Sequence, residues 1–469
     1  MSGSPRPTPT VVISNLPPGT LVGIDLFSFT SSPNFHGVKD LPPGAHFLYT
    51  GTTESFSLRS GEWFYIGESS DSGRSDQLTH PSYIDIRLRK WDKALETVVL
   101  VDESNDAGRQ EAMQLRANLG RIWASGGFLS YQSRLNARPT KPVEEGGEED
   151  GRGHSDEHVP SRSDWQRLAD HISPSVLNRI LGAVAPATNF SERRWTITSG
   201  NSAARDTDHI PGLSTSDIAN ATGIAVEREK ELKFLPVDLK KTWREGAIGR
   251  ERTEAAQDHS WALGDLIKHA VPAGQPPGVD ADAAGEEQLL GELQFTFLMV
   301  LTLMNFSCLE QWKRLLSLIF TCKNAVKERE GFFIRVLQLF GLQLRHCDDV
   351  EGGLFEMDGD DGGALLKNLL TKFKASVDDI DIPGEMRVKE ELTHLENWVK
   401  REYGWELSRA SIVRRGMLEL EDGEQVELEV NGAEEEDETG EYAPVIVDLG
   451  AGGLAEHPGE DIDMVDRPS

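Results

Sequence analysis

The sequence is poor in cysteine and contains no long apolar run. Its three cysteines, Cys308, Cys322 and Cys347, are odd in number and have neither a CxxC nor any other zinc spacing. Because they lie within apolar helical patterns, we expect buried free thiols in a reducing compartment rather than disulfides or a metal site. The longest apolar stretch, residues 293–304, falls well short of the roughly 20 residues that a membrane-spanning helix requires, so we expect no membrane partner.

Clustered basic residues are also missing. The chain has 469 residues and a formal net charge of -30, and residues 421–469 hold 17 acidic side chains against one basic side chain, Arg467. Because clustered lysine and arginine are needed to neutralise phosphates, we expect no direct binding of nucleic acid, and any link to RNA should pass through another protein. Residues 1–10 are polar and proline-rich, so we expect a disordered N-terminus and no export signal.

Recognisable catalytic motifs are absent as well. The chain contains no phosphate-binding loop, no HExxH, no GxSxG elbow and no dinucleotide glycine fingerprint. The acidic residues 358–363 superficially resemble a calcium loop, but Leu369 occupies the twelfth position, where calcium loops carry a glutamate. Asp25, His36 and His46 have no nucleophile in a recognisable context beside them, so structural roles are favoured. We therefore expect no enzyme activity, no metal and no cofactor.

Short apolar runs separated by turn residues predict an N-terminal β-sandwich or barrel-like domain over residues 11–138. Two Leu-Pro-Pro-Gly units, residues 16–19 and 41–44, are typical of turns, because proline fixes φ and glycine tolerates positive φ. Towards the end of this domain the alternation changes to a helical pattern, and we expect this helix to pack against the strands. Its apolar positions are Met113, Leu115, Leu119 and Ile122.

The middle of the chain has a mixed character. Residues 139–163 are rich in glycine, proline and charge and have no apolar anchors, so we expect a disordered acidic linker. Residues 164–242 follow as connecting helices and loops, with one helix ending before Ser173-Pro174 and the next beginning there. Within this region, residues 196–230 are expected to be mostly loop.

Apolar residues at helical spacing predict a C-terminal multi-helix bundle over residues 243–407, so the fold class is α+β. The strongest signal runs from residue 289 to residue 320, where a break near Asn305 predicts two antiparallel helices joined by a tight turn. Trp261 and Trp312 lie within apolar helical spacing and are predicted to be in the core. Lys313 and Arg314 are predicted to form a solvated helix face.

The acidic tail, residues 408–469, contains one isolated apolar segment, residues 442–449, which predicts a strand that completes the sheet of a partner. The predicted contact residues are Ala443, Pro444, Val445, Ile446, Val447, Asp448 and Leu449. Burial of about five apolar side chains contributes roughly 1.5 to 3 kcal/mol each. This gain nearly offsets the cost of ordering the backbone, which is about 1 to 2 kcal/mol for each of about seven residues. The strand alone should therefore bind weakly and add to a second contact made by the folded body. The alternative is that it docks onto the chain's own β domain.

Two serines at the start of the tail are candidate phosphorylation sites. Ser408 and Ser411 lie in the basic segment LSRASIVRR, and Arg409 precedes Ser411 by two residues. Such triplets are common by chance, so the pattern does not choose between the two serines.

Several segments, taken in order, resemble the Aar-two family of splicing factors. They are VVISNLPPGTLVGIDLFSF and NFHGVKDLPPGAHFLYT near the N-terminus, then MQLRANL, DHSWALGDL, LLGELQFTFLMVL, QWKRLLSLI and finally APVIVDL. The resemblance spans nearly the whole chain, and we expect a fungal member. The chain departs from the family at about residues 139–163, 196–230 and 408–441, which leaves the register of the tail contacts less defined.

The resemblance implies a non-catalytic chaperone of pre-mRNA splicing that acts on the U5 small nuclear ribonucleoprotein (U5 snRNP) precursor, before the tri-snRNP and the spliceosome form. Members of the family hold the scaffold protein Prp-eight by its RNase-H-like and Jab/MPN-like domains and block premature loading of the helicase. Their C-terminal segment adds a strand between those two domains, and phosphorylation releases the complex. We expect a monomer in the cytoplasm and nucleus. The alternative function is a general cytosolic helical adaptor unrelated to splicing.

Overall fold

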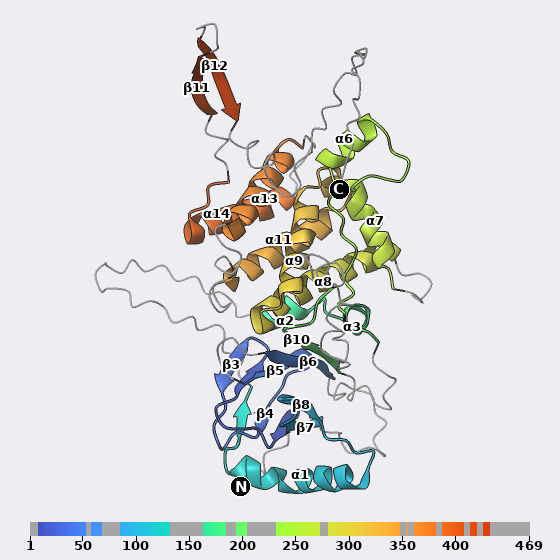
Figure 1. Cartoon of the computed structure of the whole chain (residues 1–469), viewed down its shortest axis with the longest axis vertical. Coiled ribbons are helices and arrows are strands. Elements are labelled where there is room, and N and C mark those ends of the chain that lie inside the picture. Colours follow the sequence, from blue (N-terminus) through green and yellow to red (C-terminus); the bar gives the residue numbers. More distant parts are fainter. Residues whose placement is uncertain are drawn as a thin grey trace, which may run out of the picture. The chain divides into compact units, whose positions relative to one another are not determined.

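The computed structural model divides the chain into two compact units, Met1–Ser408 and Arg409–Ser469. The residues it describes are 8–52, 58–67, 85–131, 163–183, 194–203, 231–272, 280–347, 354, 361–380, 387–407, 413–419 and 425–431. The first unit contains two β-sheets and a set of helices, which confirms the predicted α+β class (Figure 1).

The β part is a sandwich of two five-stranded sheets. Sheet A has the strand order β8-β7-β1-β4-β9, from β1 (Thr10–Ser14), β4 (Gly37–Lys39), β7 (Ile86–Asp92), β8 (Thr97–Leu100) and β9 (Phe128–Ser130). Sheet B has the order β10-β6-β5-β2-β3, from β2 (Leu21–Ile24), β3 (Phe27–Thr30), β5 (Gly44–Gly51), β6 (Arg59–Ile66) and β10 (Trp195–Thr198). One buried cluster joins Val11 and Val38 of sheet A to Val22, Leu48 and Phe64 of sheet B. The predicted sandwich is therefore confirmed.

Strand β10 lies at the start of a region, residues 196–230, that was expected to be mostly loop; only residues 194–203 of this part of the chain are described. It pairs antiparallel with β6, with Trp195 opposite Trp63 and Thr198 opposite Ser60. Trp195 and Ile197 are buried while Thr196 and Thr198 are half-buried, as period-two alternation requires. A strand of four residues is too short to be predicted from a sequence pattern. It forms because it pairs with residues of β6 that lie more than 130 residues away in the sequence.

Helix α1 (Asp106–Ala124) packs on sheet A, as predicted. Ala112 and Leu119 on the helix lie in one cluster with Val12 and Leu88 of the sheet. Figure 1 shows α1 on the side of the sandwich that faces away from the other helices. Met113 was predicted on the packing face but is 70% exposed, because it lies two residues, or about 200° around the helix, before Leu115.

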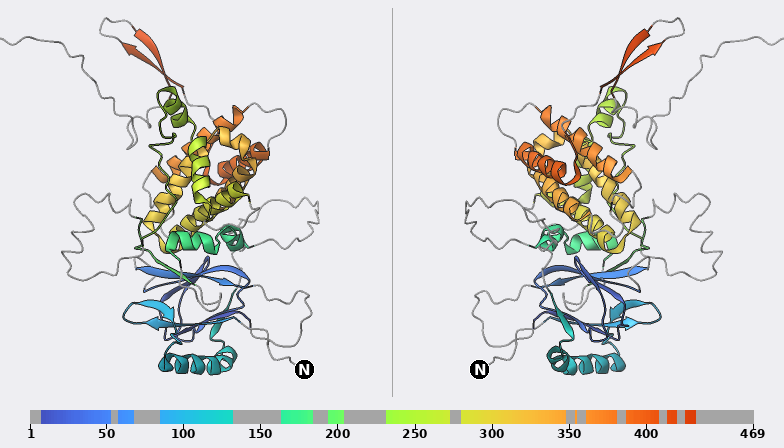
Figure 2. Two further views of the ribbon diagram at one scale, coloured as in Figure 1. Left: turned by 90° about the vertical axis from the view of Figure 1, so that its right-hand side faces the viewer. Right: turned by 90° about the vertical axis from the view of Figure 1, so that its left-hand side faces the viewer.

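Between residues 250 and 403 the chain forms helices, most of which pack together as the bundle predicted from the apolar spacing (Figure 2). They are α6 (Arg250–Gln257), α7 (Ser260–Ala270), α8 (Ala281–Leu303), α9 (Phe306–Phe320), α10 (Asn324–Glu328), α11 (Glu330–Arg345), α13 (Asp361–Asp378) and α14 (Arg387–Tyr403). Helices α8 and α9 are joined through Met304, whose φ of 58° reverses the chain, and Asn305, whose side chain caps α9. The predicted helix pair with a tight turn is confirmed.

Two predictions for this bundle are wrong, one of a core position and one of a solvated helix face. Trp312 is buried as expected, and its Nε1 donates to Gln343 Oε1 at 3.0 Å. Trp261 is 44% exposed, because the buried face of α7 begins two residues later at Leu263. The side chains of Lys313 and Arg314 are only 17% exposed and both contact Glu310, so they do not form a freely solvated face.

None of the three cysteines forms a disulfide, and all three are buried, as predicted. Burial raises the pKa of the Cys322 thiol well above its ordinary value, which makes this thiol a poor nucleophile. Within the described ranges, no helix combines the length and the apolar character needed to cross a membrane. The second unit contains an antiparallel hairpin, β11 (Val413–Glu419) with β12 (Gln425–Asn431), in which Gly416 lies opposite Leu428.

Candidate functional site

The residues predicted to bind a partner lie outside the described part of the chain. These are Ala443, Pro444, Val445, Ile446, Val447, Asp448 and Leu449, together with the candidate phosphorylation sites Ser408 and Ser411. The acidic linker at residues 139–162 lies outside it as well. The site that the structure does describe is the junction at which the β-sandwich is joined to the helices.

A bridging segment, residues 163–181, lies between sheet B and helix α8 (Figure 2). It consists of α2 (Asp164–Ala169) and α3 (Pro174–Leu181). On its sheet side, Trp165 stacks on Trp63 with ring centroids 5.6 Å apart, and Trp165 Nε1 donates to the Ala45 carbonyl at 2.8 Å. The Tyr65 hydroxyl donates to the Ile172 carbonyl at 2.7 Å. These contacts place the segment directly on the sandwich.

Local sequence explains why the bridging segment forms two short helices. Ser163 and Gln166 form a capping box at the start of α2. Ser173 caps α3, and Pro174 occupies its first turn, where a missing N–H costs nothing. The break predicted at Ser173-Pro174 is therefore confirmed.

On its other side, the bridging segment is bound to α8 by Gln294, and Gly291 leaves room for the close approach of the two backbones. Gln294 Oε1 accepts from the His171 main-chain N–H at 2.8 Å, and Gln294 Nε2 donates to Asp170 Oδ1 at 2.7 Å and to the Arg167 carbonyl at 3.0 Å. A Cβ atom at Gly291 would lie 2.5 Å from the His171 carbonyl oxygen. The glycine thus permits the close approach that the glutamine bonds require.

We expect Gly291→Ala to lower the free energy of unfolding by about 1 to 3 kcal/mol, the usual cost of overpacking a tight contact. The matched control is Gly264→Ala in α7, where an added Cβ meets nothing within 4 Å and should stabilise the helix by about 0.5 to 1 kcal/mol. Urea denaturation of both variants checks this. Equal effects of the two substitutions would show that the backbone of the junction tolerates the methyl group.

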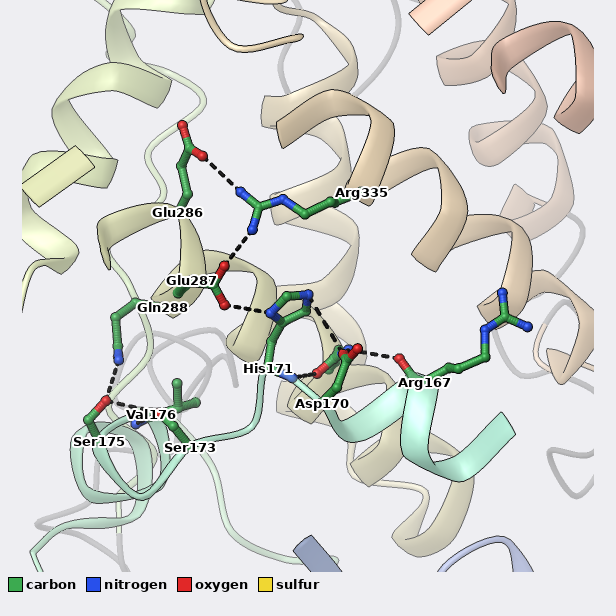
Figure 3. Close-up of polar contacts among 11 residues, drawn as sticks. Arg167, Asp170, His171, Ser173, Ser175, Val176, Glu286, Glu287, Gln288 and Arg335 are labelled. Atoms are coloured by element: carbon green, nitrogen blue, oxygen red, sulfur yellow. Dashed lines mark hydrogen bonds and ion pairs between the residues drawn. The ribbon is translucent and has the colours of Figure 1, made fainter. Parts of the chain in front are cut away.

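A row of ion pairs continues from the bridging segment across α8 to α11. His171 Nδ1 lies 2.6 Å from Glu287 Oε2, and Arg335 contacts both Glu287 and Glu286, the latter at 2.9 Å (Figure 3). Arg329 extends the row, 2.8 Å from Glu286 Oε1. The hydrogen bond from His171 is the largest cause of a lowered pKa at Glu287. Charged side chains here join three separate elements.

Glu292 of α8 is a polar group of the junction whose side chain is fully buried. Its carboxylate accepts from Arg179 of α3, from the Leu235 main-chain N–H at 3.0 Å, and from Gln311 Nε2 at 2.6 Å. Gln311 Nε2 also donates to the Leu235 carbonyl at 3.1 Å. One carboxylate thus binds α3, α9 and the segment around Leu235 to α8.

Sequence reasoning did not identify Glu292 as important. The signal available was a carboxylate in an otherwise apolar helical stretch, GELQFTFLMVL, where a charge is costly unless it is paired. Nothing in the sequence indicated the partners, because Arg179 and Leu235 are 113 and 57 residues away.

A second contact between the sandwich and the helices lies at the turn between α8 and α9. Arg59 of β6 donates through Nη1 to the Thr302 carbonyl at 3.0 Å. Asn305, besides capping α9, donates through Nδ2 to the carbonyls of Thr198, Ser199 and Asn201 at 2.8 to 3.2 Å. One hydrophobic cluster runs through both parts, from Phe47 and Trp63 of sheet B to the cores of α8 and α9.

Asp25, His36 and His46 are the polar residues of the β domain that were weighed as a catalytic set, and the structure brings Asp25 and His46 together. His46 Nδ1 lies 2.7 Å from Asp25 Oδ2, and the Tyr131 hydroxyl donates to the same oxygen at 2.6 Å. His36 is not part of this group, since its Nδ1 lies 2.9 Å from the Phe35 carbonyl. All three polar groups of the Asp25 cluster are engaged by one another, which fits the structural role predicted for Asp25 and His46.

The Asp25 contact predicts a pH dependence of stability. Burial by itself lowers the pKa of His46, but the Asp25 carboxylate outweighs burial and holds this pKa above its ordinary value of 6.5. The stabilisation is therefore fully present below about pH 6.5 and is lost as the pH rises through the folded-state value. As the pH rises above about 6.5, we expect the free energy of unfolding of the parent chain to fall more steeply than that of the His46→Gln variant. Parallel curves in urea titrations would contradict this.

In the part of the chain that the structure describes, no group of three or more His, Cys, Asp or Glu side chains is placed to hold a metal. The buried polar side chains named above are instead used to join elements. The fold and its junction therefore define a two-part α+β scaffold, in which a β-sandwich and a helical bundle share one core.

Comparison with known proteins then identifies the family. Models of the AAR2 N-terminal domain and of the AAR2 C-terminal repeat region match residues 7–182 and 234–408. The chain belongs to the AAR2 family, which confirms the resemblance seen in the sequence. This membership supports a splicing-related role as an assembly factor of the U5 snRNP, of a non-enzymatic kind.

Individual relatives are similar over most of their length. The Protein AAR2 homolog of Mus musculus is 25% identical over 343 residues, which cover 71% of this chain and 75% of that protein. The Homo sapiens homolog is 24% identical over the same shares. The Caenorhabditis elegans homolog is 20% identical over 404 residues, 84% of this chain and 92% of that protein. These relatives are animal proteins, so the expected fungal source stays a prediction.

Proposed function

We propose that this chain binds the Prp-eight scaffold protein during U5 snRNP biogenesis and blocks premature loading of the helicase. In this proposal the partner surfaces are the RNase-H-like and Jab/MPN-like domains, and the tail strand at residues 442–449 completes a partner sheet. The observation that carries the proposal is the match of both AAR2 regions, in order, to the sandwich and to the helical bundle.

The junction supports a binding role for the body. Two parts that share one core and are joined through Gln294 and Asn305 present their surfaces in a fixed relative arrangement. A preformed surface loses little conformational entropy on binding. The tail strand, which gains little free energy alone, then adds to this contact through its high local concentration.

The charge of the chain supports a protein partner over RNA. With a net charge of -30, the chain repels phosphate backbones at long range. The acidic run at residues 434–438, just before the tail strand, would keep RNA away from basic surfaces of the bound scaffold.

The test is affinity capture with the tagged full-length chain from cell extract. We expect recovery of Prp-eight without its helicase, and loss of Prp-eight from the captured material when purified helicase is added in excess. Capture of trafficking or folding factors without Prp-eight would contradict the proposal and favour a general helical adaptor. Capture of Prp-eight together with the helicase would contradict the blocking role.

We further propose that the chain acts as a monomer in cytoplasm and nucleus and that phosphorylation of Ser408 or Ser411 releases the partner. Each phosphate adds negative charge and strong hydrogen-bond acceptors beside Arg409. We expect the double substitution Ser408→Glu with Ser411→Glu to weaken binding by about tenfold, a usual size for regulatory coupling. The double alanine variant is the control, and equal affinities of the two variants would exclude both serines.

A further inference from the structure

The hairpin formed by β2 and β3 lies at one edge of sheet B and is almost without charge. Strand β3 is the last in the order β10-β6-β5-β2-β3. Residues 16–38 contain a single formal charge, the carboxylate of Asp25, in a chain of which 27% is charged. Edge strands are usually protected against pairing with another chain by lysine, proline or a bulge. The four residues of β3, Phe-Ser-Phe-Thr, include no charged residue and no proline.

The turn of this hairpin is held rigidly. Asp25 adopts a φ of 58° between β2 and β3, a conformation suited to a two-residue turn. Its buried carboxylate accepts from the Phe47 N–H at 2.8 Å and also contacts His46 and Tyr131. The edge is therefore fixed before any partner arrives, which lowers the entropy cost of pairing.

The exposed side of β3 carries both apolar surface and hydrogen-bonding groups. Phe27 is 42% exposed, and its ring lies 5.5 Å from that of Phe29. In the register of the hairpin, Phe27 lies opposite Ile24 and Ser28 lies opposite Gly23. In an antiparallel hairpin, hydrogen-bonded and non-hydrogen-bonded residue pairs alternate, and the pair beside a two-residue turn, here Ile24 and Phe27, is hydrogen-bonded. Gly23 and Ser28 therefore form a non-hydrogen-bonded pair, so the main-chain N–H and C=O of Ser28 point away from β2.

We propose that β3 binds an uncharged, extended segment of another protein by β-augmentation, with an apolar side chain of that segment packed on Phe27. Main-chain hydrogen bonds at Ser28 supply affinity, and the ring contact supplies selectivity. A charged side chain at that position is disfavoured, because it loses water and the one carboxylate in residues 16–38, Asp25, is buried and already engaged by His46 and Tyr131. This inference does not rest on the proposed function.

The test uses the full-length chain and the synthetic peptide acetyl-TVTFTVT-amide, with binding followed by hydrogen exchange. We expect the peptide to slow exchange of the Ser28 amide, and a peptide with lysine in place of its phenylalanine to bind at least about tenfold more weakly. Phe27→Lys should lower affinity for the first peptide by about tenfold or more. Leu95→Lys is the matched control, because Leu95 is also exposed, at 66%, and lies in the turn between β7 and β8.

Three results would overturn the inference. They are no binding at about 1 mM peptide, equal affinities of the Phe27→Lys and Leu95→Lys variants, and slowed exchange at β8 or β9 in place of β3. If Phe27→Lys does not fold, Phe27→Thr removes the ring without adding charge, and an unchanged affinity of that variant is again a contradiction.

Discussion

Replacement of Glu292 by alanine is expected to lower the free energy of unfolding by about 3 to 5 kcal/mol, the usual result of removing one partner from a buried ion pair. The carboxylate is fully buried and contacts Arg179, Leu235 and Gln311. Its loss leaves the Arg179 guanidinium without its opposite charge. It also leaves the Leu235 N–H without an acceptor, and each buried unpaired group adds its own desolvation cost.

Denaturation in urea, followed by circular dichroism, measures this effect. Glu254→Ala is the matched control, because it removes a glutamate whose pair with Arg250 is exposed and therefore contributes little. We expect a barely measurable change for the control. A loss of less than about 1 kcal/mol in Glu292→Ala would show that the junction does not depend on this carboxylate.

Deletion of residues 442–449 is expected to lower affinity for a fragment containing both the RNase-H-like and the Jab/MPN-like domain by about 100-fold. In the proposed complex the tail strand and the body bind as two linked contacts, so that removing one leaves only the other. Binding to the RNase-H-like domain alone should be reduced less, because the proposed strand spans the two domains.

The control for this deletion is removal of residues 433–440, AEEEDETG, which are equal in number and contain no apolar run. Isothermal titration with each chain compares the two deletions directly. Equal losses of affinity would mean that tail length or charge matters and the apolar strand does not.

Much of the fold was predictable because its signals are local. The helices α8 and α9 follow from apolar spacing, and the break between them follows from the capping residue Asn305. The start of α3 follows from Ser173-Pro174 in the same way. The sandwich was predictable as a class, because short apolar runs between turn residues have few other outcomes.

The features that sequence reasoning missed depend on distant partners. Strand β10 exists because β6 pairs with it, and Glu292 is satisfied by groups from three other elements. Apolar helical spacing placed Trp261 in the core and Met113 on a packing face, but their positions on α7 and α1 turn them away from the buried face. The predicted partner strand at residues 442–449 stays a prediction, as do Ser408 and Ser411.

In the proposed complex, one chain binds both Prp-eight domains at once, through its body and its tail strand. The most direct measurement is an equilibrium titration of the intact chain with the purified two-domain fragment and with each domain separately. We predict a one-to-one complex with the two-domain fragment that is at least about 100-fold tighter than with either domain alone. Equal affinity for the fragment and for a single domain, or no binding to any of them, would contradict the account.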